Sequence, residues 1–281
     1  MKKLTLAVAF ATLCAGSVLA QDNQAVLTQE GADNKSTITQ TGNANSTRTE
    51  AFGNESVIDI VQEGDNNAVD NRVEGNNVTS MTDQIGDQNL SEQAITGDDV
   101  QALLMARGNN NTNNITITGN ENFTRMVNEG DRNLSIQLQE GNQNVSDIIS
   151  AGSDNRNISE QRGDNNDIIL GQTGDANTAI SIQDGDSNSA FLLQEGDNNT
   201  VNTRQTGNNN AVGLETDGGG VDQIGNNNIV GLKQEGDGNF GTAFQVGDDN
   251  AGVIDQVSNG NSSILTQSGN RNDASIEQSN Q

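Results

Sequence analysis

Residues 172–205 read QTGDANTAISIQDGDSNSAFLLQEGDNNTVNTRQ, and glycine stands in this stretch at positions 174, 185 and 196. The same 11-residue spacing holds without a break from Gly31 to Gly218 and resumes, after an interval of seven residues, at Gly225. Of 23 such sub-repeats, 22 keep the glycine, 19 carry Asn three residues after it and 15 carry Gln two residues before it. This regularity indicates an array of stacked units, and it decides the architecture before any single motif does.

The composition is too polar for a conventional globular core. The 281 residues include six Phe, no Trp, no Tyr and 31% apolar residues. A stacked array needs only a thin core shared between neighbouring units, so the periodicity outweighs the polar composition. The formal net charge of -26 argues against nucleic acid or anionic lipid as a partner.

Residues 1–20 form a separate element. Lys2 and Lys3 precede an apolar run, and small residues lead to Ala20, which is the pattern of a secretory signal peptide cleaved after Ala20. A lipoprotein anchor at Cys14 is the alternative, although Leu13 stands where such an anchor normally has a small residue. Cleavage removes the single cysteine, so the mature chain has no thiol for a disulfide, a nucleophile or a metal site. No other stretch is long and apolar enough to span a bilayer.

Each sub-repeat contains the alternation of a β-strand. The fifth residue after the glycine is mostly small or β-branched, and the seventh is often Ile or Leu. The ninth is the Gln that precedes the next glycine. These positions share a parity and so point to one face of an extended strand. An odd period would turn that face over at every repeat unless the chain reverses, and Gly, Asn and Asp suit a reversal. The turn residues that fit best are Gly64, Asn67, Gly86, Asn89, Gly141, Asn144, Gly163, Asn166, Gly174, Asn177, Gly196 and Asn199.

A second period predicts how many strands make one layer. At the seventh position, large apolar residues alternate with small polar ones such as Thr49 and Ser181, so the true repeat is 22 residues. We predict an all-β fold, a flat two-sheet β-solenoid of about 12 strand-turn-strand layers with cross-β stacking, in one domain from residue 21 to 281. The shortened arm at 218–224 is interpreted as a truncated strand that keeps the alternation in phase. The predicted apolar core is Ile38, Ile60, Leu104, Met126, Ile148, Leu170, Leu192, Leu214, Leu232, Ile254, Leu265 and Ile276.

The Gln at the ninth position is predicted to lie inside. A buried amide is costly unless it is hydrogen-bonded, and a Gln stacked on the Gln of the next layer can donate one way and accept the other. The alternative is that these amides are solvated loop residues, and it applies more readily to the Asn of the turn. The predicted ladder is Gln29, Gln40, Gln62, Gln84, Gln139, Gln161, Gln172, Gln183, Gln194, Gln205, Gln223, Gln234, Gln245, Gln256, Gln267 and Gln278.

The unit from Gln172 to Gln183 resembles the curlin repeat, whose pattern runs Gln-x-Gly-x-x-Asn-x-Ala-x-x-x-Gln, and matches it at every specified position. The unit from Gln194 to Gln205 is similar, and the resemblance covers nearly the whole chain after residue 20. It implies a subunit of a curli-type functional amyloid, secreted through the bacterial outer membrane, assembled outside the cell and serving in biofilm matrix, adhesion and aggregation. The partners it implies are further copies of the chain and curli-type secretion and nucleation proteins, with no nucleic acid and no membrane insertion.

An enzyme is not expected, and neither is a cofactor or a metal. The mature chain has neither His nor Cys for a catalytic triad, and its acidic residues recur at turn positions without a unique pair. The motif runs into the last residues, so uncapped end layers are expected to stack head to tail. The predicted assembly edges are Leu27, Gln29, Ala274, Ile276 and Gln278.

Two further interpretations remain open. A minor, nucleating subunit would need a membrane-associating terminus, and neither end is apolar or basic, so a major fibre-forming role is favoured. A soluble secreted solenoid that binds ice, or calcium in the manner of an adhesin, is the alternative from another class. Ice binding calls for Thr-x-Thr in phase, and calcium β-rolls carry a nonapeptide spacing; this sequence has neither.

Overall fold

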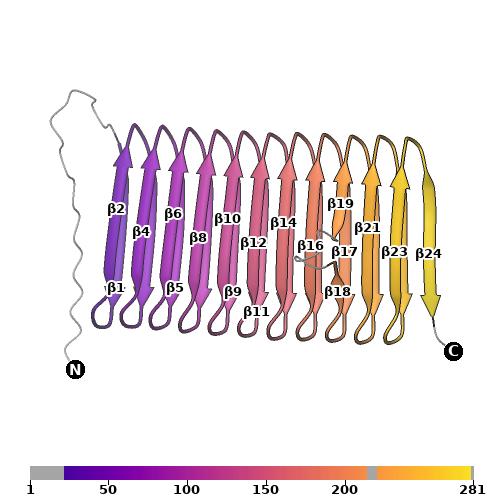
Figure 1. Ribbon diagram of the computed structural model, residues 1–281. Coiled ribbons are helices and arrows are strands. Elements are labelled where there is room, and N and C mark those ends of the chain that lie inside the picture. Colours follow the sequence, from indigo (N-terminus) through magenta and orange to yellow (C-terminus); the bar gives the residue numbers. More distant parts are fainter. Residues whose placement is uncertain (1–21, 214–219, 280–281) are drawn as a thin grey trace.

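The computed structural model describes residues 22–213 and 220–279 of the chain. The predicted signal peptide and Leu214 lie outside these described residues. Throughout the described ranges the chain consists of strands and turns, arranged as two parallel sheets that face each other across a thin core (Figure 1). The prediction of a flat two-sheet β-solenoid is confirmed.

The two sheets take alternate strands of the chain, because each turn carries the backbone from one sheet to the other. Sheet A contains β1 (Gln24–Glu30), β3 (Ser46–Phe52), β5 (Ala68–Glu74), β7 (Leu90–Thr96), β9 (Thr112–Thr118), β11 (Leu134–Glu140), β13 (Arg156–Arg162), β15 (Thr178–Asp184), β17 (Thr200–Thr206), β20 (Ile229–Glu235), β22 (Ala251–Val257) and β24 (Asp273–Ser279). Sheet B contains β2 (Lys35–Thr41), β4 (Val57–Glu63), β6 (Thr79–Ile85), β8 (Gln101–Arg107), β10 (Phe123–Glu129), β12 (Val145–Ala151), β14 (Asp167–Thr173), β16 (Ser189–Glu195), β18 (Ala211–Val212), β19 (Val221–Ile224), β21 (Phe240–Val246) and β23 (Ser262–Ser268).

Neighbouring strands of a sheet are in register at a spacing of 22 residues. Ile148 of β12 pairs with Leu170 of β14, and Gln161 of β13 pairs with Gln183 of β15. Equivalent side chains therefore stand directly above one another, which is the arrangement that the 22-residue repeat predicts.

The prediction of a truncated strand at 218–224 is wrong. β18 and β19 both pair with β16 on one side and with β21 on the other, so they are two parts of a single rung. The seven extra residues are therefore an insertion within that rung. Both parts pair with β16 and with β21, so the backbone groups of each part have partners on both sides. Val221 occupies the core position between Leu192 and Ala243 in the register, the place that was predicted for Leu214.

The insertion also changes the phase of the core. Because the arm that begins at Gly207 and the shortened arm at 218–224 form one rung, every later arm lies in the opposite sheet from the one predicted. Leu232 and Ile254 lie in sheet A, in register with Thr203, and not in the sheet that holds Leu170 and Leu192. The expectation that the alternation stays in phase is thus also wrong. Among the described strands, sheet A has twelve rungs, and sheet B has twelve strands in eleven rungs.

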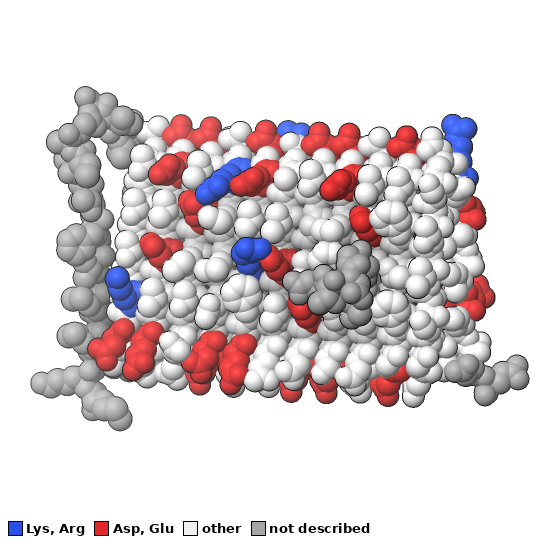
Figure 2. Space-filling view, viewed as in Figure 1, with Lys and Arg blue, Asp and Glu red and all other residues white. Residues whose placement is uncertain are grey.

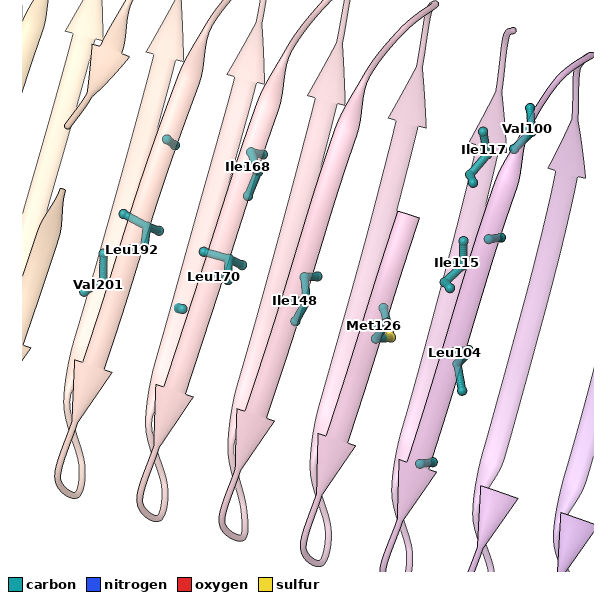
Figure 3. Close-up of a cluster of buried hydrophobic side chains, with 14 of the residues drawn as sticks. Val100, Leu104, Ile115, Ile117, Met126, Ile148, Ile168, Leu170, Leu192 and Val201 are labelled. Carbon is teal, nitrogen blue, oxygen red and sulfur yellow. The ribbon is translucent and has the colours of Figure 1, made fainter. Parts of the chain in front are cut away.

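The core is a single layer of interdigitated side chains. In sheet B, Ile60, Leu104, Met126, Ile148, Leu170 and Leu192 are at most 1% exposed. The last five of these are labelled in Figure 3. Ile38 and Ile276, in the outer layers, are only partly buried against this cluster. Full burial of such a side chain contributes about 1.5–3 kcal/mol, so a thin core repeated over many layers can hold a polar chain together.

Each turn follows one backbone pattern. In the turn that starts at Gly174, the glycine has φ +114° and Ala176, two residues later, has φ +57°. The position two residues after the glycine is occupied by Ala, Ser, Glu or Arg in other turns, so its positive φ does not require one residue type. The glycine is selected by the next layer, because a Cβ on Gly174 would lie 2.2 Å from the carbonyl oxygen of Gly196.

Candidate functional site

Gln side chains of neighbouring layers are hydrogen-bonded to one another in sheet A. From β11 to β24 the Nε2 of each Gln donates to the Oε1 of the Gln in the following layer, at 2.9–3.1 Å. The column comprises Gln139, Gln161, Gln183, Gln205, Gln234, Gln256 and Gln278. All its bonds point the same way, from the N-terminal toward the C-terminal layers.

Sheet B holds two shorter columns of the same kind. One runs through Gln40, Gln62 and Gln84, and the other through Gln172, Gln194, Gln223, Gln245 and Gln267, with Nε2–Oε1 distances of 2.6–2.9 Å. The Gln194–Gln223 bond spans the insertion. The direction of donation is the same as in sheet A.

The second N–H of these amides reaches the backbone of the other sheet. Gln161 donates to Gln183 and also to the carbonyl oxygen of Val145, at 2.8 Å. Gln183 makes the equivalent bond to Asp167, at 2.9 Å. Both protons of the amide are therefore used, which offsets the cost of burying it.

The columns are interrupted in the N-terminal half. In sheet A, Ala51, Val73, Ile95 and Ile117 stand where later layers carry Gln, and in sheet B Ala106, Asn128 and Ser150 do so. Gln29 consequently has Ala51, and not a Gln, beside it in the next strand of sheet A, and its Nε2 donates to Ser36 Oγ at 2.6 Å. The N-terminal half of sheet A depends on apolar contact where the C-terminal half depends on amides.

The turn Asn forms a second kind of column. Asn166 is buried, its Nδ2 donates to the carbonyl oxygen of Gly185 at 2.8 Å, and its backbone N–H donates to Asn144 Oδ1 at 3.0 Å. Asn67, Asn89, Asn144, Asn177 and Asn199 are also at most 1% exposed and bond in the same way to the glycine of the next layer. These side chains are structural members of the stack and not solvated loop residues.

The Asp that follows many of the glycines has a structural partner as well. The backbone N–H of Asp175 donates to Asp197 Oδ1 in the next layer at 2.8 Å, and Asn142 donates to Asp164 Oδ1 at 2.7 Å. Acidic side chains consequently lie along both turn edges of the solenoid (Figure 2). The sequence signal for this bond is the recurrence of an Asp or Asn acceptor directly after the glycine every 22 residues. Among the described residues, no group of three or more His, Cys, Asp or Glu could hold a metal ion.

Layers are also joined by ion pairs on the surface. Arg132 and Asp154 occupy equivalent turn positions in successive layers on one edge, with Nη2 and Oδ2 2.7 Å apart. Arg125 of β10 and Asp147 of β12 form a similar bidentate pair on the face of sheet B. Opposite charges one layer apart therefore meet readily in this fold.

The end rungs are the places where the stack has neighbours on one side only. β1 and β2 form one end and β23 and β24 the other. Leu27 and Gln29 at the first end, and Ala274, Ile276 and Gln278 at the second, are all half-buried. On the outer faces of the same rungs, Val26 is 58% and Ile264 is 67% exposed.

The ladder donors and acceptors are left incomplete at opposite ends. Gln267 donates only to the carbonyl of Ala251 at 2.8 Å, and Gln278 only to that of Ser262 at 2.9 Å, whereas inner Gln residues donate to two groups. At the first end, the Oε1 atoms of Gln29 and Gln40 accept from no described residue. One end thus presents amide donors and the other presents amide acceptors, together with the unpaired edges of their strands.

These features define a parallel cross-β solenoid whose side chains stack in columns along its axis. The curlin associated repeat matches the chain at residues 163–196 and at residues 247–279. The chain therefore carries curlin repeats in these two segments, as the resemblance of its sequence predicts. A search of curated proteins gave no significant match. Residues 22–213 and 220–279 include no helix long and apolar enough to cross a membrane.

Proposed function

We propose that this chain is a secreted structural subunit that assembles end to end into extracellular fibres of the curli type, serving in biofilm matrix, adhesion and aggregation. It acts as the major, fibre-forming subunit and not as an enzyme. Its partners are further copies of itself and secretion and nucleation proteins of the curli type. Residues 1–20 direct its export.

The complementarity of the two ends carries this proposal. The donors of Gln267 and Gln278 meet acceptors on the first layer of another copy, and each strand edge pairs with an edge of the same register. An interface between two different surfaces of one molecule is heterologous, so it does not close and generates a filament. The curlin-associated repeats support the same conclusion.

The direct test is assembly of the chain produced without residues 1–20. After incubation at neutral pH, electron microscopy is expected to reveal unbranched fibres, and fibre diffraction is expected to give an axial reflection at about 4.8 Å. A chain that stays monomeric at high concentration, without this reflection, contradicts the proposal.

A matched pair of variants separates assembly from folding. Ile276→Lys places a charge on the last rung, so we expect a folded monomer by circular dichroism and loss of fibre growth. Ile254→Lys places the same charge one layer further in, where the side chain is 1% exposed, and we expect it to unfold the adjoining layers. Fibre growth by the Ile276→Lys variant at the parent rate would contradict the assignment of the end rung.

A further inference from the structure

The number of rungs in the described array is odd. Sheet A has twelve rungs and sheet B eleven, because β18 and β19 share one rung, so the first and last strands, β1 and β24, both belong to sheet A. Had the seven-residue interval formed a rung of its own, the two sheets would have been equal. The insertion therefore determines which sheet meets the next copy.

The rungs of the two sheets are staggered by half a rung. Thr47 in β3 accepts from Gln40 in β2 at 3.2 Å and donates to Gln62 in β4 at 2.8 Å, so β3 lies level with the gap between them. In the same way, Asn128 in β10 donates to Asn113 in β9 and accepts from Ser135 in β11. At the C-terminal end β24 thus projects beyond β23, and at the N-terminal end β1 projects beyond β2.

This stagger restricts how two copies can stack. If sheet A of one copy continues sheet A of the next, the two projecting strands, β24 and β1, meet, and a rung is left vacant in sheet B between β23 and the next β2. A vacant rung leaves two rows of backbone groups without partners. If the next copy is turned by half a turn about the long axis, its projecting β1 fits beside the recessed β23, and its β2 fits beside β24.

We propose that successive copies in the fibre are related by such a half turn, so that sheet A of each copy runs on into sheet B of the next. The inference rests on the proposed end-to-end assembly and adds the geometry of the contact. The partner is a second copy of this chain, and the surfaces are the β23–β24 end of one copy and the β1–β2 end of the other.

The exposed side chains of the end strands complement each other in this arrangement. With the 22-residue register continued, Val26 of β1 stands beside Ile264 of β23, and these are the two most exposed large apolar residues in the described chain. Lys35 of β2 stands beside Asp273 of β24. Without the half turn, Val26 would instead stand beside Ser275, and Lys35 would stand across the vacant rung from Ser262.

The turns complement each other as well. The half turn places the turn at Gly31 above the turn at Gly269, which puts Asp33 next to Arg271 at the same turn position. The Arg132–Asp154 pair occupies the same relative position inside the molecule, with a 2.7 Å contact. In the straight arrangement these two turns belong to opposite edges and do not meet.

The core side chains are compatible with the half turn. Gln267 and Gln278 would donate to the Oε1 atoms of Gln29 and Gln40 of the next copy, extending both columns. Ile276, which continues the apolar column of Leu232 and Ile254 in sheet A, would stack on Ile38. The two Gln columns and this apolar column therefore continue through the interface, with Gln stacked on Gln and Ile stacked on Ile.

Engineered cysteines can distinguish the two arrangements, because the chain without residues 1–20 has no cysteine of its own. Paired residues of adjacent parallel strands lie within the Cα separation of about 4.4–6.8 Å that a disulfide spans. We expect fibres of the Val26→Cys/Ile264→Cys variant to be linked by oxidation into dimers, trimers and longer covalent species on a non-reducing gel. Because the two positions lie at opposite ends of one copy, each link must join two copies.

The matched control is Val26→Cys/Ser275→Cys, which the half turn leaves as monomers after the same oxidation. A second pair tests the other sheet: Lys35→Cys/Asp273→Cys is expected to link, whereas in the straight arrangement these two positions lie in different sheets and stay unlinked. Fibres that link through the Val26→Cys/Ser275→Cys pair, or through no pair, overturn the half turn and leave end-to-end assembly standing. Absence of fibres, with a normal β spectrum of the monomer, overturns both proposals.

Discussion

At the residue scale, the repeat is enforced by the layer above each residue. A Cβ on Gly247 would lie 2.2 Å from the carbonyl oxygen of Gly269, whereas the nearest atom to a Cβ on Gly269 is Asn272 Nδ2, at 3.7 Å. Both glycines have similar positive φ, so the backbone strain of adding a side chain is about the same at the two positions. The two positions differ only in the steric contact that the added Cβ would make. Two positions with one sequence motif thus carry different constraints.

This contrast predicts different outcomes for two identical substitutions. Gly247→Ala should destabilise the monomer strongly, because backbone atoms of the next layer must move. Gly269→Ala should cost only the strain of positive φ, about 1–2 kcal/mol, but should slow fibre growth because the next copy approaches there. Thermal unfolding of monomers and seeded growth assays measure the two effects. Equal loss of monomer stability in the two variants would contradict this reasoning.

The Gln columns predict a cost for removing one member. Gln194→Leu keeps the side-chain volume but leaves the Nε2 of Gln172 and the Oε1 of Gln223 without their partners. Each orphaned buried group costs about 1–3 kcal/mol, so for two groups we expect the free energy of unfolding to fall by about 2–6 kcal/mol. Gln101→Ala, at an exposed strand position, is the control and should change it by less than about 0.5 kcal/mol. A similar loss in both variants would argue against a buried ladder.

Replacement of the Asp83 carboxyl group is predicted to stabilise the protein in a pH-dependent way. Burial raises the pKa of this carboxyl group, Glu63 raises it further, and Arg107 partly opposes the shift. The folded state therefore binds the proton more tightly than the unfolded state, and the ionised carboxylate opposes folding at pH 7. Asp83→Asn should raise the melting temperature at pH 7, and the gain should shrink as the pH falls through the pKa of the folded state. A gain that grows on acidification would show that another group controls this region.

At the element scale, strands of one length are held by two different means. In the N-terminal half, Val73, Ile95 and Ile117 of sheet A replace the amides, and in the C-terminal half continuous Gln columns take over. The seven extra residues are inserted between β18 and β19. These two strands pair with the same neighbours and together make one rung. The backbone ladder tolerates the insertion because pairing resumes in the same register.

Deletion of residues 213–219 tests this account. The register between β16 and β21 requires one residue between Val212 and Val221, and Gly220 remains to supply it. We expect an unchanged β spectrum and a melting temperature no lower than that of the parent, because a shorter connection costs less closure entropy. Deletion of residues 196–202, also seven residues, removes a turn and should unfold the layers around it. A fall in melting temperature for the first variant would contradict a single shared rung.

At the scale of the whole molecule, charge opposes the stacking that the ends favour. The formal net charge is -26, and acidic residues line both edges of the solenoid (Figure 2). Copies added end to end bring these edges into line, so we expect fibre growth to accelerate when salt rises from about 0.01 M to 0.15 M, as the Debye length shortens from about 30 Å to 8 Å. Growth followed by light scattering measures this effect. Growth that slows with salt would indicate that pairs such as Lys35 and Asp273 outweigh the repulsion.

Much of this protein follows from its sequence alone. The 11-residue glycine spacing, the 22-residue alternation and the parity of the Gln positions determine the strand-turn unit, the two sheets and the inward residues such as Ile148 and Gln161. They do so because a repeat of equal units can satisfy its backbone only by stacking each unit on the next. The regular recurrence of Gly and Asn, as at Gly174 and Asn177, suffices to place the turns.

Only the tertiary structure decided where the seven extra residues, 213–219, belong. Spacing alone cannot distinguish a short strand from an insertion, because both restore the glycine rhythm; the difference lies in which backbone groups β16 and β21 find opposite them. That pairing moves Leu232 and Ile254 to sheet A and makes the number of rungs odd. Burial of the turn Asn and the bond to each Asp after glycine were likewise decided between layers, since their partners are 19 to 22 residues away along the chain.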